Sequence, residues 1–541
     1  MNNQIYSFPL PQNEPVKGYL KGSAERIALE AELERQSKIE IEVPLIIGGK
    51  EIRTGNTGKV VMPHNHKHVL ATYHKAGEKE VQMAIDAAME ARKVWSETPW
   101  TTRAAIILKI ADLVAGKYRA LVNASTMLGQ SKNIFQAEID SACELVDFLR
   151  YNCAFASQIY SIQPKSAYGQ INSTEYRPLE GFVFALSPFN FTSIASNLSM
   201  TPVLMGNVAV WKPSTTAILS NYYLMKIYKE AGLPDGVVNF IPGSGATIGK
   251  VIMASKDLAG IHFTGSSATF NTLWTQVGDN IANYKTYPRL VGETGGKDFI
   301  FVHPSADVKA VVHAAFTGAF EFQGQKCSAA SRMYAPKSLW PSILEGIKAF
   351  AAEVKMGDVA DPMNFINAVI DETSFDNIAS YIEYAKSASD AKIVVGGGYD
   401  KSVGYFVQPT VIETTNPQFK SIKEEIFGPV LTVYVYDDDK LEETVRFCDE
   451  TSPYGLTGSV FGQDRLAVEK ITSDLRYAAG NFYVNDRPTG AVVGMQPFGG
   501  SRASGTNDKA GGPFNLIRWV LPRVIKETLV PPTDYRYGYM K

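Results

Sequence analysis

Four short apolar runs, each followed by a glycine or polar turn and then usually by a helical pattern, lie between residues 181 and 266 and constrain the fold most. They read GFVFAL (181–186), GNVAVWK (206–212), VVNFIPG (237–243) and GIHFTGS (260–266). Apolar strands alternating with helices predict an α/β fold with a doubly wound, Rossmann-like parallel sheet. Ligands of such sheets collect where strands end and helices begin, because helix N-termini present free N–H groups to anions. We therefore expect a nucleotide-binding domain here.

The usual dinucleotide fingerprint is missing from this region. The turn FTGSSATF has one glycine, Gly265, where a GxGxxG loop has three. An ordinary strand-to-helix turn with Ser266 at the helix start remains an alternative. Lys212 and Ser214 follow the second run, where a cation and a hydroxyl can hold ribose hydroxyls. No acidic residue follows closely to repel a 2′-phosphate, so the sequence leaves both NAD and NADP open.

A lone cysteine, Cys327, lies in the stretch FEFQGQKCSAASR, behind a glycine-bearing turn and ahead of small residues. A thiolate attacks carbonyl carbon well, and small neighbours permit a close approach. The alternative is a small buried hydrophobic side chain. Upstream, VGETGGK offers the carboxylate of Glu293 on a glycine-rich turn. A cysteine with a separate carboxylate base suggests aldehyde oxidation through a thioester.

Length and composition narrow the class of protein. A chain of 541 residues points to two or three domains. With 53 basic and 55 acidic residues, nothing favours nucleic acid or an anionic membrane as a partner. The four cysteines form no CxxC pair, which argues against a disulfide framework or a zinc site and favours a reducing compartment. The start resembles neither a signal nor a transit peptide, and no apolar run is long enough to span a membrane.

The first 180 residues are interpreted as scaffold. We expect a helix over 23–38, a solvated loop at the histidine cluster 63–74, and long amphipathic helices over 78–157. The histidine spacing could suit a metal, but no further ligand lies beside it, so no metal site is predicted. Glu144, in the last helical stretch, has a solvated helix-face position as its alternative to a functional role. The polar stretch 168–178 is typical of an extended hairpin that pairs with another subunit.

Seven motifs in order along the chain resemble the aldehyde dehydrogenase superfamily: SPFNF, WKPS, FTGS, GETGGK, GQKCSA, EEIFGPV and QPFGG. The resemblance covers nearly the whole chain and implies a cofactor domain, a catalytic domain and a small β oligomerisation element. The implied boundaries are 1–158 with 182–291 for the arm and cofactor domain, 292–507 for the catalytic domain, and 159–181 with 508–541 for the oligomerisation element.

The resemblance also implies catalytic roles. Cys327 would attack the aldehyde, Asn190 and the Cys327 backbone N–H would hold the oxyanion, and Glu293 would activate water to hydrolyse the thioester. Lys297 lies four residues after Glu293, and an ion pair between them would prevent Glu293 from acting as a base. We interpret Lys297 as a structural residue. Lys326 could lower the pKa of the neighbouring thiol, although adjacent side chains in an extended loop often point apart.

NAD is the implied cofactor. A phenylalanine, Phe270, stands where the family commonly has glycine, which leaves the pyrophosphate contact in doubt. For EEIFGPV taken alone, a helix end would be the preferred interpretation. The implied cofactor-binding residues are Ser187, Lys212, Ser214, Gly265, Ser266, Glu425 and Phe427.

Within the superfamily, FNFTSI, FQGQKCSAASR and TGAVVGMQPFGGSRASGTNDKAGGP resemble the branch that oxidises L-glutamate 5-semialdehyde, the open form of 1-pyrroline-5-carboxylate, in proline catabolism. An α-amino acid head needs carboxylate donors on closely approaching backbone. A flexible turn is the alternative for TGAVVG. The implied substrate residues are Ser328, Gly490 and Ala491 at the carboxylate, Phe191 and Phe498 beside the chain, and Glu144 near the amino group.

Two other functions stay open. One is oxidation of another small semialdehyde, such as succinic semialdehyde, and the more distant one is a non-catalytic nucleotide-binding protein. We expect a homodimer or larger homo-oligomer, and a separate proline dehydrogenase as a possible partner. The expected location is a bacterial cytoplasm, or the mitochondrial matrix if the chain is a processed form.

Overall fold

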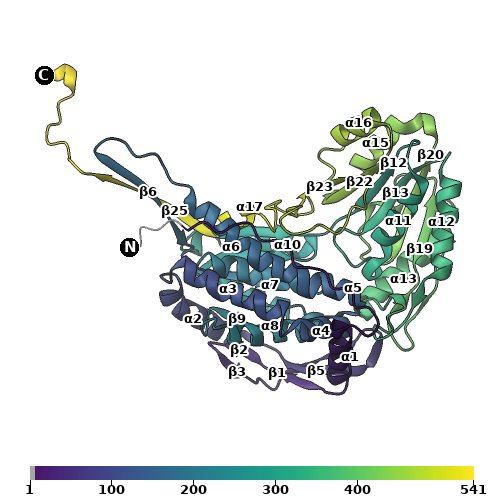
Figure 1. Cartoon of the computed structure of the whole chain (residues 1–541), viewed down its shortest axis with the longest axis horizontal. Helices are drawn as coiled ribbons and strands as arrows, with labels where there is room; N and C mark the ends of the chain where they lie inside the picture. The colour runs from purple at the N-terminus through teal and green to yellow at the C-terminus, as the bar shows by residue number, and fades with distance from the viewer. Residues whose placement is uncertain (1–5) are drawn as a thin grey trace.

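The computed structural model describes residues 6–541 and contains two lobes, each built on a seven-stranded sheet (Figure 1). The strand order is β11-β10-β7-β8-β9-β2-β3 in the first sheet and β16-β19-β20-β13-β12-β22-β23 in the second. Both sheets are mainly parallel and carry helices, which confirms the predicted α/β class. The first five residues, part of the start where we expect no targeting peptide, lie outside the described residues.

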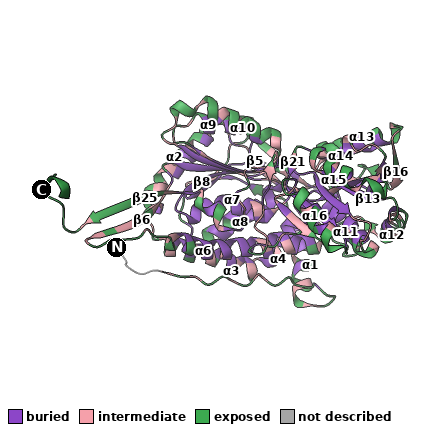
Figure 2. Cartoon of the chain, turned by 90° about the horizontal axis from the view of Figure 1, so that it is seen from above, coloured by how far each residue is buried: buried purple, intermediate pink, exposed green. Residues whose placement is uncertain are grey.

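The four predicted strands of the first sheet are all present; three are shorter than their apolar runs, and β10 begins two residues before its run. They lie side by side with β11, and their carboxyl ends meet at one edge of the sheet. Helices cover both faces of the sheet, with α9 and α10 on one side and α7 and α8 on the other (Figure 2). Burial on both faces explains why these strands are continuous apolar runs. The bounds are β7 Phe182–Leu186, α7 Thr192–Leu204, β8 Val208–Lys212, α8 Ile218–Ala231, β9 Val238–Phe240, α9 Gly245–Ala254, β10 Leu258–Thr264, α10 Ser267–Asp279 and β11 Arg289–Glu293, with the hairpin β2 Leu45–Ile47 and β3 Lys50–Ile52 at the far edge.

The second sheet carries the segment that contains Cys327. Five of its strands run parallel to β12, and β16 is an antiparallel edge strand. The bounds are β12 Asp298–Val302, α11 Val308–Phe320, β13 Ala330–Pro336, α12 Trp340–Glu353, α13 Glu372–Ser387, β16 Ala391–Val395, β19 Thr410–Thr414, α14 Lys420–Lys423, β20 Val430–Tyr436, α15 Leu441–Glu450, β22 Thr457–Phe461, α16 Arg465–Asp474 and β23 Asn481–Val484.

The amino-terminal helices are confirmed, with one difference in the last. The stretch predicted as one amphipathic helix contains a π-helical segment, Glu138–Glu144, before the α-helix continues. Glu138 and Asp140, which the amphipathic interpretation would leave in water, are fully buried and each holds a basic side chain. The bounds are α1 Ala24–Ser37, α2 Glu78–Trp95, α3 Trp100–Ala115, α4 Arg119–Gln130, α5 Ile134–Ala137 and α6 Leu145–Ser161.

The histidine cluster is not a solvated loop, as the sequence led us to expect. It lies mostly in β5 (Asn65–His74), which pairs with β4 (Thr57–Met62) and β1 (Ile41–Val43). His64 and His74 are only 4% and 5% exposed, because their apolar neighbours draw the strand into the core. Over residues 6–541 we find no group of three or more acidic, histidine or cysteine side chains that could hold a metal ion.

The stretch 168–178 does not form a hairpin by itself. Its strand β6 (Gln170–Pro178) pairs antiparallel with β25 (Val520–Thr528), so it joins the tail segment instead. This ribbon projects from the first lobe and leads to the carboxyl terminus (Figure 1). Residues 163–166 lie beside β6 but bond it through side chains, apart from the isolated bridge of Ala167 with Gln170, so its strand partner comes from the tail. Among the described residues no helix is long and apolar enough to cross a membrane.

Candidate functional site

Cys327 lies after a sharply turned segment that joins α11 to β13. Phe322, Gln323 and Gly324 all have φ between 51° and 65°, in the left-handed region. Such a conformation is strained for side chains other than glycine, and it persists where surrounding contacts hold it. At Gly324 a Cβ would lie 2.3 Å from the carbonyl oxygen of Gly428, so glycine is required there.

Side chains of this turn fix it to the neighbouring chain. Gln323 donates to the carbonyl oxygen of Ala368 at 2.8 Å and accepts from the N–H of Asn367 at 3.0 Å. Gln325 accepts from the N–H of Ile370 at 2.8 Å. These buried bonds hold the turn, which leaves the cysteine at the junction of the two lobes.

Two cavities meet at Cys327, which lines both. The larger, which we call the Lys212 cleft, lies at the carboxyl edge of the first sheet and has a volume of about 640 Å³. The smaller, which we call the Phe191 cavity, has a volume of about 110 Å³. Cys327 is therefore the point where a molecule in one can meet a molecule in the other.

The predicted site residues divide cleanly between these cavities. Asn190 lines the Lys212 cleft with every residue predicted for the cofactor, namely Ser187, Lys212, Ser214, Gly265, Ser266, Glu425 and Phe427. Glu293 lines the Phe191 cavity with every residue predicted for the substrate, namely Glu144, Phe191, Ser328, Gly490, Ala491 and Phe498.

Asn190 follows the end of β7 and is 3% exposed. Its side-chain amide donates to the carbonyl oxygen of Gln325 at 3.1 Å, two residues before the cysteine. This bond joins the first lobe to the turn before Cys327. An amide has two N–H donors, so Asn190 keeps one for another acceptor.

Glu293 ends β11, and its Oε2 atom is buried with no hydrogen-bond partner among the described residues. Burial raises its pKa well above the usual range, while the charge of Lys509 acts in the opposite direction. Lys297 does not bind Glu293. Its Nζ is buried, also has no hydrogen-bond partner among residues 6–541, and has a pKa lowered to about 7 by burial. Once deprotonated, Glu293 therefore has an oxygen that no described residue occupies and that can accept a proton.

Lys326 pairs with a carboxylate, which speaks against the activation of the thiol considered above. Its Nζ lies 3.0 Å from Oε2 of Glu321 in a buried ion pair. Burial raises the pKa of Cys327 well above its usual value, and the carboxylates of Asp298 and Glu293 raise it further. The resting cysteine is therefore a protonated thiol that needs a base before it can attack.

The Lys212 cleft gathers groups suited to a nucleotide. Burial lowers the pKa of Lys212 to about 8, and among the described residues its Nζ bonds only the carbonyl oxygen of Pro213, at 3.2 Å. Ser266 caps the N-terminus of α10 by accepting from the N–H of Thr269 at 3.2 Å. Glu425 lies beyond the end of α14 and accepts from the N–H of Gly296 at 2.8 Å.

Phe270 lies away from this cleft. Its ring is 6% exposed and stacks on Phe263 at 5.4 Å between centroids. A Cβ on Gly292 would lie 2.4 Å from the Phe270 ring, so this glycine makes room for the phenylalanine inside the sheet packing. The departure from the family pattern is therefore accommodated in the core, where Phe270 packs behind Phe263, a residue that lines the cleft.

In the Phe191 cavity, polar groups gather at one end. The hydroxyl oxygens of Ser328 and Thr489 lie 2.8 Å apart, next to Gly490, whose φ is +95°. Glu144 is half-buried and accepts from the hydroxyl of Ser193 at 3.0 Å, and burial raises its pKa to about 8. The solvated helix-face position considered for Glu144 is therefore wrong, because the π-helical segment turns this carboxyl group inward.

The sequence reasoning missed several charged residues of this cavity. Arg487 binds Oε1 of Glu321 at 2.6 Å, while Lys326 holds the other oxygen of the same carboxylate. All three line the cavity with Thr489. Thr489 is the first residue of the predicted TGAVVG loop and Arg487 lies two residues before it, which was the available signal. No spacing rule connects Glu321 to Arg487.

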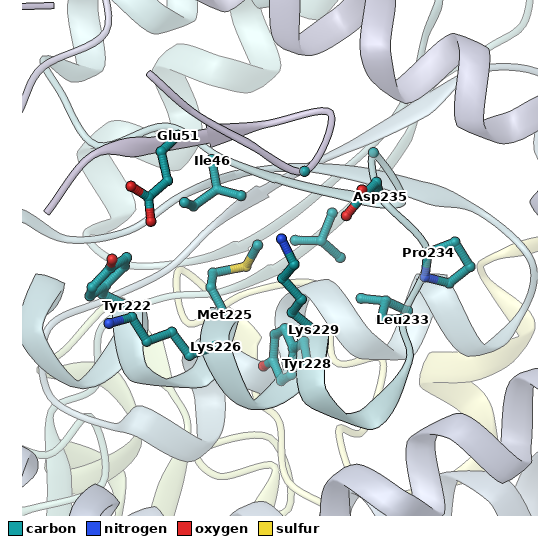
Figure 3. Close-up of a pocket in the computed structure, with 13 residues that line it drawn as sticks. Ile46, Glu51, Tyr222, Met225, Lys226, Tyr228, Lys229, Leu233, Pro234 and Asp235 are labelled. Carbon is teal, nitrogen blue, oxygen red and sulfur yellow. The ribbon is translucent and has the colours of Figure 1, made fainter. Parts of the chain in front are cut away.

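A separate hollow lies between α8 and the hairpin of β2 and β3 (Figure 3). Lys226, Lys229, Glu51 and Asp235 contribute charges, and Tyr222 lies beside them. None of the predicted site residues lines it, and its residues include no nucleophile beside a general base. It is not a candidate catalytic site.

The match to known proteins agrees with this geometry. Residues 52–522 match the model of the Aldehyde dehydrogenase family, and the chain belongs to that family. A Dictyostelium discoideum protein named mitochondrial delta-1-pyrroline-5-carboxylate dehydrogenase is 52% identical over 537 residues, 99% of this chain and 96% of that one. A crystal structure of the Mycobacterium tuberculosis delta-pyrroline-5-carboxylate dehydrogenase bound with NAD has a TM-score of 0.96 and 49% identity over the full length of both chains. Proline utilization A from Bdellovibrio bacteriovorus has a TM-score of 0.92 and 27% identity, and the match covers 99% of this chain but 55% of that one.

Proposed function

We propose that this chain oxidises L-glutamate 5-semialdehyde, formed by opening of 1-pyrroline-5-carboxylate, to L-glutamate with NAD as the oxidant. The observation that carries the proposal is that Cys327 lines both cavities, with the nucleotide-type residues on one side and the anchor for an amino acid on the other. The names of the full-length relatives support the same substrate.

The first step is attack of the Cys327 sulfur on the aldehyde carbon. The thiol has a raised pKa, so its proton must pass to a base as the bond forms, and Glu293 in the same cavity has an unpartnered oxygen for it. The aldehyde oxygen becomes an oxyanion. The free N–H of Asn190 and the backbone N–H of Cys327 would donate to it.

The Lys212 cleft fits NAD. A half-buried lysine with one weak bond among the described residues, a carboxylate and the capped N-terminus of α10 surround it at the carboxyl edge of the sheet. Lys212 and Glu425 would hold ribose hydroxyls, Ser266 the pyrophosphate, and Phe427 the nicotinamide side. Bound there, NAD supplies the acceptor for the hydride that leaves the thiohemiacetal carbon, and a thioester on Cys327 remains.

Thioester hydrolysis then needs a base for water. Glu293 first releases the thiol's proton to solvent, and its Oε2, which has no hydrogen-bond partner among the described residues, can then take a proton from water. Hydrolysis releases L-glutamate and returns the thiol.

The Phe191 cavity supports an amino acid head on the substrate. Ser328, Gly490 and Ala491 would donate to its carboxylate, while Phe191 and Phe498 would contact the aliphatic part. Glu144 would face the amino group. Succinic semialdehyde has no amino group, so this inward carboxyl group favours the glutamate derivative over that alternative.

The direct test is NADH formation with 1-pyrroline-5-carboxylate, succinic semialdehyde and a simple aliphatic aldehyde, with Cys327→Ala as the blank. We expect a strong preference for the first substrate, no turnover in the blank, and retained NAD binding by the variant. If the enzyme oxidised another aldehyde equally well or better, the proposed substrate would be wrong. Failure with all three would favour a non-catalytic nucleotide-binding protein.

We also propose that the ribbon of β6 and β25 joins two or more copies of the chain. Sedimentation of the full chain beside one shortened before residue 520 would test this, since only the full chain should associate. A proline dehydrogenase would supply the substrate, and the match to part of proline utilization A supports that pairing. For the location we favour a bacterial cytoplasm, with the mitochondrial matrix as the alternative that the name of the Dictyostelium relative supports.

A further inference from the structure

A buried ion pair lies directly behind the site, formed by Lys132 after α4 and Asp140 in the π-helical segment. Lys132 Nζ lies 2.7 Å from Oδ2 of Asp140. The two residues are 1% and 0% exposed. None of the roles assigned above uses either residue, although burying such a pair is unfavourable unless further contacts compensate.

Asp140 caps a helix to which it does not belong. Its Oδ2 accepts from the N–H of Thr192 at 2.9 Å, and its Oδ1 accepts from the N–H of Ser193 at 2.8 Å. These are the first two residues of α7, and the residue before them, Phe191, provides no side-chain cap. A helix leaves its first N–H groups unpaired, so a carboxylate there fixes where the helix begins.

The position of this helix start bears on the chemistry. Asn190 is two residues before Thr192, and its amide reaches the carbonyl oxygen of Gln325. A shift of the α7 start would move Asn190 relative to Cys327. Displacement of about 1 Å at such a site can slow a reaction ~100-fold.

Lys132 connects the same helix start to the turn before Cys327. Its Nζ lies 4.0 Å from the ring centroid of Phe191 and 4.4 Å from that of Phe322, which has a left-handed φ of 51°. A cation between two ring faces attracts both. One lysine thus contacts the segment that bears Asn190 and the strained segment that bears Cys327.

We infer that Lys132 and Asp140 are positioning residues, which set Asn190 against Cys327 for stabilisation of the oxyanion. The inference rests on the proposed function, because Asn190 has its oxyanion role there. Neither residue touches the reacting atoms. Both act through the start of α7 and, for Lys132, through Phe322.

A double-mutant cycle tests the inference. The measurement is the rate of the first NADH formed per site after mixing with 1-pyrroline-5-carboxylate at saturating NAD. We expect Asn190→Ala to slow it ~100-fold or more and Asp140→Asn to slow it ~10-fold to ~100-fold. If Asp140 acts through Asn190, adding Asp140→Asn to Asn190→Ala should slow it further by much less than the ~10-fold to ~100-fold that Asp140→Asn causes alone. Full multiplication of the two single effects would overturn the inference.

Glu138→Gln is the matched control. Glu138 forms a buried ion pair with Arg119 on the same π-helical segment, but it contacts neither α7 nor the turn before Cys327 in any bond that the described residues make. Its rate should stay within ~2-fold of wild type even if its melting temperature falls, because it acts on stability alone. Slowing of the control equal to that of Asp140→Asn would also overturn the inference.

Asp140→Asn leaves Lys132 unpaired and could prevent folding, so a second variant combines it with Lys132→Met. Removing both charges relieves the unpaired ion. The combined variant should fold yet remain at least ~10-fold slow, and a wild-type rate would overturn the inference. If the wild type oxidises a different aldehyde, the proposed substrate fails, but the same cycle with that aldehyde still measures the coupling.

Discussion

The hydroxyl oxygens of Ser328 and Thr489 lie 2.8 Å apart and join the segment after Cys327 to the loop that carries Gly490. Only one of two such hydroxyls can donate in their shared bond. The hydroxyl that accepts in this bond keeps its own hydrogen, which it can donate to a substrate carboxylate. The pair therefore couples the nucleophile loop to the proposed carboxylate anchor.

Thr489→Val should weaken binding of the amino acid substrate while sparing the chemistry. Loss of the Thr489 hydroxyl leaves Ser328 without its partner, and a hydrogen bond to a charged group is worth about 1.5–3 kcal/mol. We expect KM for 1-pyrroline-5-carboxylate to rise ~10-fold or more. Steady-state kinetics with a simple aliphatic aldehyde is the control, since this compound has no carboxylate. An equal rise in KM for both substrates would contradict the role of Ser328 and Thr489 in binding the carboxylate.

Glu144→Gln should separate substrates by their amino group. The amide cannot take on the negative charge that the carboxyl group would carry opposite a bound ammonium group, and it keeps nearly the same size. The rise in KM for 1-pyrroline-5-carboxylate should exceed the rise in KM for succinic semialdehyde by about tenfold. A variant that discriminates between the two substrates as the wild type does would show that Glu144 has no part in recognition.

The same variant should change how stability depends on pH. Burial raises the pKa of Glu144 to about 8, whereas an unfolded glutamate has a pKa of about 4.3. The native state therefore binds this proton more tightly, and the free energy of unfolding should fall as pH rises between these values. In Glu144→Gln the decline should be smaller, by at most about 1.4 kcal/mol per pH unit. Urea unfolding at about pH 5 and about pH 8 measures it, and identical pH profiles would contradict the burial of this group.

Lys509 should set the pH at which hydrolysis begins. Glu293 acts as a base only when deprotonated, and burial raises its pKa while the charge of Lys509 opposes that rise. Lys509→Met removes the opposing charge, so the acidic limb of the thioester hydrolysis rate should move to higher pH. Lys509→Arg keeps the charge and should leave the limb nearer to wild type. A limb that moves to lower pH in Lys509→Met would refute the role of Glu293 as the base.

Much of the fold could be predicted because the local pattern of apolar residues matches the burial of the strands in the structure. The runs that became β7, β8, β9 and β10 are apolar throughout, as strands covered on both faces must be. The ribbon was harder. Which strand pairs with β6 depends on β25, hundreds of residues away, and no local pattern identifies that partner.

The site residues that could be predicted are those that stand in short, distinctive sequence motifs. Cys327 and Glu293 stand in short glycine-bearing stretches whose small residues are visible in the sequence. The local pattern alone left Glu144 on a solvated helix face and gave Asp140 no role, since a π-helical segment turns both inward and its periodicity resembles that of an ordinary helix. Only the family resemblance placed Glu144 near the amino group. The pairing of Glu321 with Lys326 was equally hidden, because side-chain direction in a strained turn follows tertiary contacts.

The most direct test of the central claim is to trap the thioester on Cys327. The Glu293→Gln variant is mixed with NAD and 1-pyrroline-5-carboxylate, and the amount of NADH formed per site is measured. The mass of the peptide that contains Cys327 is then determined by mass spectrometry. The account predicts about one NADH per site, slow turnover afterwards, and a glutamyl adduct on that peptide. Unchanged steady turnover, or a burst of NADH with an unmodified Cys327, would contradict it.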